Sequence, residues 1–75
     1  MSPKLPVVSG AQLIKAFGKL GYYIRSQQGS HILLRHPIHP PLTIPNHRDV
    51  ARGTLRAILR QAGLSLDTFV ELLKK

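Results

Sequence analysis

The sequence of 75 residues predicts a small α+β domain in the order α-β-β-β-α with a short extra C-terminal helix. Two segments with helical hydrophobic periodicity flank a central stretch of alternating residues. A Gly-Ser turn signal and a proline-rich segment divide that stretch into three short strands. Because so small a sheet buries one face, we expect a three-stranded antiparallel sheet packed on helices on one face.

The first helix is predicted to begin after Ser9, which forms a capping-box pattern with Gln12. Gly21 supplies the C-terminal stop. Residues 1–8, which precede this helix, are expected to be extended because they contain prolines. The apolar face of this helix is formed by residues at helical spacing: Leu13, Ile14, Phe17 and Leu20.

Three strands are predicted at residues 22–27, 31–36 and 42–44. Residues 28–30 form the first turn, where glycine can adopt a positive φ. Residues 37–41 cannot be strand interior, because their three prolines remove donors from the ladder.

Alternation along the second strand predicts which side chains lie on the open face of the sheet. Ile32 and Leu34 should point toward the helices, and His31 and Arg35 toward water. With an odd-length turn of three residues, Arg25 joins His31 and Arg35 on the open face.

The first strand is expected to match this register. Tyr22 and Ile24 then point inward, while the residues that point outward are Tyr23, Arg25 and Gln27. A two-residue turn would break this match. One of the two tyrosines is expected in the core, and either could stack on bases.

After a polar loop, a second helix is predicted to open at Val50 or Ala51 and to end at Gly63. Its apolar stripe consists of Leu55, Ile58, Leu59 and Ala62. The opposite face carries a row of arginines four residues apart, which is either a phosphate-binding face or a solvated helix surface: Arg52, Arg56 and Arg60. A last helix should span residues 66–73 with Ser65 as its N-cap.

The charge balance points to a polyanionic partner. Eleven Lys and Arg stand against three acids, which gives a formal net charge of +8. Nucleic acid is the commonest partner of so basic a domain, with an anionic membrane, an acidic protein or a merely solvated surface as alternatives. The absence of cysteine rules out disulfides and thiol chemistry and favours the cytoplasm. No apolar run approaches the roughly 20 residues of a membrane span, and no signal core is present.

A histidine beside arginines is suited to RNA cleavage, because RNA carries its own nucleophile, the 2′-OH. An imidazole titrates near working pH and can remove that proton, and arginines stabilise the negative charge that develops on phosphorus. The three acids, Asp49, Asp67 and Glu71, are too few for a two-metal site. We therefore expect no metal and no other cofactor, with His31 as the base.

Each histidine also has a plainer interpretation. His31 alone is compatible with an ordinary surface residue. His36 and His39 flank the proline-rich segment and are expected to be solvated. His47 is either a loop-stabilising residue or a second acid–base group. The spacing of His36, His39 and His47 matches no familiar zinc-ligand pattern.

The predicted order is also that of double-stranded-RNA-binding domains, although topology alone is an analogy. Four segments resemble the HicA-type toxins of bacterial and archaeal toxin–antitoxin modules. The first two are Val8–Gly10, and Leu20–Tyr22 followed by Gln28–His31. The third is Thr43–His47, and the fourth is the long segment Arg52–Ser65.

The resemblance implies that residues 1–75 form a single HicA-like toxin domain with a double-stranded-RNA-binding-domain-like fold. It further implies a ribosome-independent mRNA endonuclease in a prokaryotic cytoplasm, with His31 as the catalytic residue. A HicB-type antitoxin would bind the toxin and cover that site, and an acidic antitoxin would complement the charge. We expect the free toxin to be a monomer that acts on mRNA or single-stranded RNA.

The residues expected to bind RNA are Arg25, Ser30, Arg35, Arg48, Arg52 and Arg56. One departure from the resemblance is the proline-rich connection at 37–41, where many relatives have a polar, glycine-containing turn. Two other functions remain open: a non-catalytic RNA-binding module that uses the same basic face, and a purely protein-binding partner of an acidic antitoxin.

Overall fold

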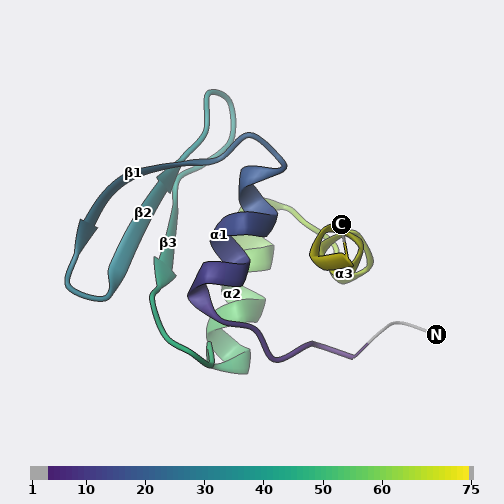
Figure 1. The fold of residues 1–75 in the computed structure, drawn as a ribbon. Coiled ribbons are helices and arrows are strands. Elements are labelled where there is room, and N and C mark those ends of the chain that lie inside the picture. The colour runs from purple at the N-terminus through teal and green to yellow at the C-terminus, as the bar shows by residue number, and fades with distance from the viewer. Residues whose placement is uncertain (1–3, 75) are drawn as a thin grey trace.

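The computed structural model describes residues 4–74 and has six elements (Figure 1). The strands form one antiparallel sheet in the order β1-β2-β3. Helices α1 and α2 cover the same face of that sheet, and α3 lies on their far side (Figure 1). The elements are α1 Gly10–Gly18, β1 Tyr23–Gln28, β2 His31–Arg35, β3 Leu42–Pro45, α2 Arg52–Ala62 and α3 Leu66–Lys74. The predicted fold class is confirmed, including the extra C-terminal helix. Residues 1–3, which belong to the segment predicted to be extended, lie outside the described part.

Helix α1 begins with the capping box that the sequence predicts. Gln12 N donates to Ser9 Oγ at 3.1 Å, and Ser9 N donates to Gln12 Oε1 at 2.8 Å. The helix ends earlier than expected, because the backbone N–H of Leu20 bonds to the carbonyl of Phe17 and tightens the last turn. Leu20 therefore lies in the turn and is 37% exposed, so its predicted place on the apolar helical face is wrong. Gly21, at φ +103°, then directs the chain into β1.

The hairpin between β1 and β2 closes with a two-residue turn rather than the expected three. Gln28 pairs with His31, which leaves Gly29 and Ser30 as the turn. Gly29 has φ +58° and is the first central residue, as in a type II′ turn. The predicted odd-length turn is therefore wrong.

A β-bulge in β1 compensates in part for that turn. Ile24 pairs with Leu34 and Ser26 pairs with Leu33, so Arg25 is the extra residue. Before the bulge, the register is the predicted one. After it, the faces are reversed: Gln27 pairs with the buried Ile32 on the helix side, and its predicted outward position is wrong.

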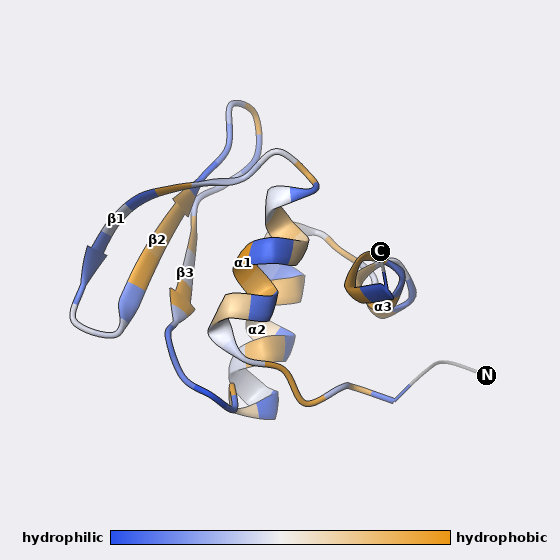
Figure 2. Cartoon of the chain, in the orientation of Figure 1, coloured by the Kyte–Doolittle hydropathy of each residue, from blue (hydrophilic) through white to orange (hydrophobic). Residues whose placement is uncertain are grey.

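The core lies between the sheet and the two main helices. Ile32 and Leu34 of β2 are buried as predicted, together with Leu42 and Ile44 of β3. Every residue of β1 is exposed, because this edge strand projects beyond the helices (Figure 1). Ile24 is consequently 57% exposed even though it shares the register of buried Leu34. In Figure 2 the hydrophobic colour is concentrated in β2 and on the helices, while the end of β1 is hydrophilic.

The C-terminal half follows the predicted caps. Helix α2 ends at Gly63, which is left-handed with φ +69°. Ser65 Oγ accepts from Thr68 N at 3.2 Å at the start of α3. Phe69 of α3 is fully buried and stacks on Phe17 of α1 with ring centroids 6.4 Å apart. The described helices are all much shorter than the roughly 20 residues needed to cross a bilayer.

His36 organises the proline-rich connection between β2 and β3. Its Nδ1 accepts from Ile38 N at 3.1 Å and from His39 N at 3.2 Å, so the proton of the neutral ring is on Nε2. Nε2 donates to the carbonyl oxygen of Leu20 at 2.9 Å. His36 is half-buried, and its predicted solvation is wrong; His39 is exposed as predicted, with its ring centroid 4.4 Å from that of His36.

Tyr22 holds the far end of the same connection. Its hydroxyl donates to the carbonyl oxygen of Pro40 at 2.9 Å. Burial raises the pKa of the Tyr22 phenol above its ordinary value of 10.0. Tyr22 is thus the tyrosine expected in the core, while Tyr23 is 52% exposed.

Candidate active site on the open face of the sheet

His31 is the first residue of β2 and follows the Gly29–Ser30 turn directly. Its side chain is exposed, because the chain alternates and the next residue, Ile32, occupies the core side. Among residues 4–74, none forms a hydrogen bond or an ion pair with the imidazole of His31. Both ring nitrogens are therefore available to a ligand.

The pairing of the strands places a row of side chains on each side of His31. Gln28 of β1 and Pro45 of β3 are its cross-strand partners. The next row along the same face consists of Ser26, Leu33 and Thr43. A shallow hollow on the open face is lined by Ser26, Gln28, His31, Leu33 and Thr43.

Four lining residues of this hollow were not found from the sequence. Ser26 and Gln28 were missed because neither the bulge nor the two-residue turn was expected. Thr43 had a usable signal, since it alternates with the buried Leu42 and Ile44 of β3. Leu33 had the same signal, because it alternates with the buried Ile32 and Leu34 of β2.

The arginines expected beside His31 share its face without adjoining it. Arg35 is exposed on the same face, but it lies four residues further along β2, about 13 Å at the backbone level. Arg25 is exposed at the bulge, three residues before Gln28, the partner of His31. The structure therefore extends the positive charge along the open face instead of gathering it at His31.

The loop after β3 lies at the same end of the sheet as His31. Asn46 N donates to the carbonyl oxygen of Ser30 at 2.6 Å, which fixes the loop to the hairpin turn. His47 follows, with an exposed side chain, and its carbonyl oxygen accepts from Gly10 N at 2.9 Å. Arg48 is exposed one residue later. The backbone at Ser30, His47 and Arg48 thus lies at the same end of the sheet as His31.

Gly10 is a positioning residue that the sequence analysis did not single out. It is buried at the start of α1, and a Cβ there would clash with the carbonyl oxygen of Pro45. Only glycine allows the helix to approach the end of β3 this closely. The position of the loop that carries His47 therefore depends on the missing side chain of Gly10.

The arginine row of α2 lies elsewhere. Arg56 and Arg60 border a groove on the helical side of the molecule, whose apolar residues are Leu5, Leu59, Leu64 and Leu66. Arg52 begins the helix and is exposed. The one ion pair within residues 4–74 joins Lys74 and Glu71 at 3.6 Å, so no acid neutralises these arginines. The structure does not bring Arg56 to His31.

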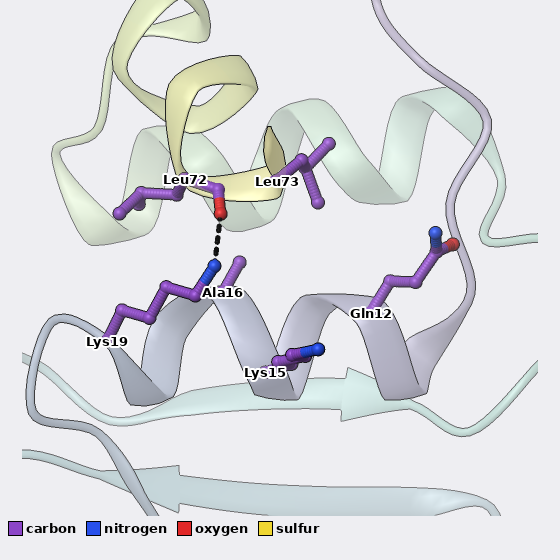
Figure 3. A pocket seen from close by; sticks show the side chains of 6 residues that line it. All are labelled: Gln12, Lys15, Ala16, Lys19, Leu72 and Leu73. Atoms are coloured by element: carbon purple, nitrogen blue, oxygen red, sulfur yellow. Dashed lines mark hydrogen bonds between the residues drawn. The ribbon is translucent and has the colours of Figure 1, made fainter. Parts of the chain in front are cut away.

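Another hollow lies between α1 and α3, lined by Gln12, Lys15, Ala16, Lys19, Leu72 and Leu73 (Figure 3). Lys19 Nζ reaches across it and donates to the carbonyl oxygen of Leu72 at 2.7 Å (Figure 3). That bond satisfies one of the last carbonyls of α3. We interpret this hollow as a helix–helix junction.

The histidines do not assemble into a zinc site. His36 lies beyond the end of β2, whereas His47 lies beyond the end of β3, which runs antiparallel to β2. The two side chains are therefore at opposite ends of the sheet. Within the part of the chain that the structure describes, no group of three or more His, Asp or Glu residues is placed to hold a metal ion.

The family described as the HicA toxin of bacterial toxin–antitoxin matches residues 10–64. A toxin–antitoxin complex from Streptococcus pneumoniae is similar in structure, with a TM-score of 0.67 and 31% identity. The match covers 76% of this chain and 98% of that one. A comparison with curated proteins found no match. The family match spans the whole sheet and both main helices, and the chain belongs to the HicA toxin family.

Proposed function

We propose that this toxin is a metal-independent RNA endonuclease that cuts mRNA without the ribosome, with His31 as its catalytic residue. The observation that carries the proposal is the state of His31. Its imidazole is exposed at the end of an open sheet face, beside a hollow, with both nitrogens unpartnered among residues 4–74. A general base must reach the proton that it removes, and this ring is free to do so.

The chemistry uses the nucleophile that RNA itself supplies. The imidazole of His31 takes the proton of a 2′-OH while that oxygen forms a bond to the adjacent phosphorus. The bond between phosphorus and the 5′-oxygen breaks, and the leaving oxygen takes a proton from an imidazolium. The products are a 2′,3′-cyclic phosphate and a 5′-OH end. The donor of the second proton is His31 itself or His47 at the same end of the sheet.

The positive charges along the site support RNA as the substrate. Arg48 lies at the His31 end, and Arg25 and Arg35 continue along the open face. Together these side chains would attract the phosphates of an RNA strand lying along the open face. With a net charge of +8, binding should weaken steeply as salt increases.

We also propose that a HicB-type antitoxin binds this chain and covers His31. The solved neighbour from Streptococcus pneumoniae is itself a toxin–antitoxin complex. None of the arginines in residues 4–74 is paired with an acid, which leaves them available to an acidic partner as well as to RNA.

The test is cleavage of a labelled, unstructured RNA in EDTA, compared with the same RNA carrying a single 2′-deoxy nucleotide at a mapped cleavage site. We expect cyclic-phosphate ends from the first RNA and loss of cutting only at the substituted site in the second. Cutting at the deoxy site would show that water is the nucleophile. RNA binding without cutting would favour the non-catalytic RNA-binding module, and no binding at low salt would favour a purely protein-binding role.

A further inference from the structure

Three uncharged polar side chains without a partner lie close together on the open face of the sheet. Ser26, Gln28 and Thr43 form no side-chain hydrogen bond with any described residue, although all three are exposed. Some comparable side chains serve the fold, since Ser9 caps α1 and Gln27 Nε2 donates to the carbonyl oxygen of Gly29 at 3.0 Å, whereas Thr54 and Gln61 on α2 are exposed without such a bond. A patch of available amide and hydroxyl groups is thus a feature of this face.

These groups surround an apolar residue. Leu33 is half-buried at the centre of the row, with Ser26 on one side and Thr43 on the other. Gln28 lies in the adjacent row beside His31. The hollow that they line measures about 340 Å³ and is open to solvent. An open hollow of this kind gives a flat ring a surface to lie against without enclosing it.

Away from His31, the chemistry of the hollow suits a base better than a phosphate. Apart from His31, its lining residues are uncharged, and the arginines of the face lie outside it. A phosphate is bound by cations and N–H donors, whereas an amide and two hydroxyls provide both donors and acceptors. That mixture matches the edge of a base, and the leucine offers an apolar contact for its ring.

We propose that Ser26, Gln28, Leu33 and Thr43 form a nucleobase subsite that binds the base next to the scissile phosphate. This assignment rests on the proposed function and deepens it, because it names the residues that select the nucleotide at the cut. Gln28 and Thr43 read the base edge, and Leu33 supports its face. A base whose edge is already paired in a duplex cannot enter, so the substrate is single-stranded RNA.

The test uses Gln28→Met, which keeps the length of the side chain but removes the amide with its donor and its acceptor, and Thr43→Val, which keeps the shape of the side chain but removes the hydroxyl. The cleavage sites of each variant are mapped on an RNA that contains every dinucleotide. We expect the wild type to prefer one base at the cut and each variant to lose about 2- to 10-fold of that preference, the value of one hydrogen bond. The melting temperature should stay unchanged, because these side chains have no partner in the folded chain.

The control is Gln61→Met, an exposed glutamine on α2 away from the hollow, which should leave the pattern of cuts unchanged. A second readout is the affinity for 2′-O-methyl oligonucleotides that differ only in the base at the cut, since these bind but cannot be cut. Base-dependent binding that Gln28→Met abolishes would support the subsite even if no cutting were seen, in which case only the proposed endonuclease activity fails. Wild-type binding and cutting without base preference, or a preference that both variants retain, would overturn the subsite.

Discussion

His31 and His36 stand at the two ends of β2, and the fold treats them in opposite ways. His36 follows the strand, is half-buried, and uses both ring nitrogens in hydrogen bonds to the backbone. His31 opens the strand, is exposed, and has no hydrogen bond to any of residues 4–74. The same side chain is a structural element at one end of the strand and an available acid–base group at the other.

The difference has a local cause at each end. Beyond Arg35 the chain enters a proline-rich connection, in which prolines cannot donate, and the remaining N–H groups of Ile38 and His39 bind the His36 ring. At the other end, the strands pair directly across the Gly29–Ser30 turn, and the side-chain bond to this turn among residues 4–74 comes from Gln27, whose Nε2 donates to the carbonyl oxygen of Gly29. Nothing there requires the imidazole of His31, so its hydrogen-bonding capacity remains for a ligand.

The largest effect is expected from a substitution of His31, which tests the contrast between the two histidines most directly. We expect His31→Ala to reduce RNA cleavage in EDTA by about 10²- to 10⁴-fold, the usual contribution of a general acid–base group. The melting temperature should not change, because the ring packs against no core residue. If the variant were unfolded, His31 would be a structural residue like His36, and the contrast would be lost.

The substitution Gly10→Ala tests whether the close packing of α1 against the end of β3 positions the loop near His31. Gly10→Ala should cost about 2–3 kcal/mol, because the added methyl meets the carbonyl oxygen of Pro45. Gly53→Ala is the matched control: its Cβ would meet nothing within 4 Å, so a helical alanine should be neutral or stabilise by up to about 1 kcal/mol. Urea unfolding measures both. Equal midpoints for Gly10→Ala and the wild type would contradict the close approach.

For His36 we expect the opposite result from that for His31: a loss of stability without a loss of cleavage. His36→Ala should lower the free energy of unfolding by about 1–2 kcal/mol, since Ile38 N and His39 N lose their acceptor. Cleavage per folded molecule should stay near the wild-type rate. Thermal unfolding and a cleavage assay at a temperature well below the transition report the two effects separately. If His36→Ala were folded but inactive, the chemistry would have been assigned to the wrong histidine.

The smallest effect is expected at Tyr22. Tyr22→Phe loses the bond to the carbonyl oxygen of Pro40, about 1 kcal/mol. Burial raises the pKa of Tyr22 in the folded chain, so the stability linked to its proton is complete below the ordinary value of 10.0 and is lost as the pH rises above it. Unfolding measured between neutral pH and pH 11 should show a smaller alkaline loss in Tyr22→Phe. An equal loss in both proteins would remove Tyr22 as its source.

Much of the fold could be predicted because its signals are local. The capping box at Ser9, the glycine stop at Gly63 and the alternation of Ile32 and Leu34 each act within a few residues. The end of α1 was less accessible, since Leu20 fits the helical spacing and only the tightened last turn displaces it.

The candidate site was harder to predict because it depends on register. The bulge at Arg25 has no glycine to mark it, and it reverses every face that follows in β1. Gln27 was expected on the open face, and the structure places Ser26 and Gln28 there instead. Arg35 was assigned to the correct face, but alternation alone carries no information about its distance from His31.

The most direct test of the central claim is single-turnover cleavage of an all-RNA oligonucleotide in EDTA by the wild type and by His31→Ala, each with and without added imidazole. The account predicts that His31→Ala is slower by at least about 10²-fold and recovers part of its rate as imidazole is added, while the wild type does not respond. A variant that cuts at the wild-type rate, with no response to imidazole, would show that His31 transfers no proton in the reaction.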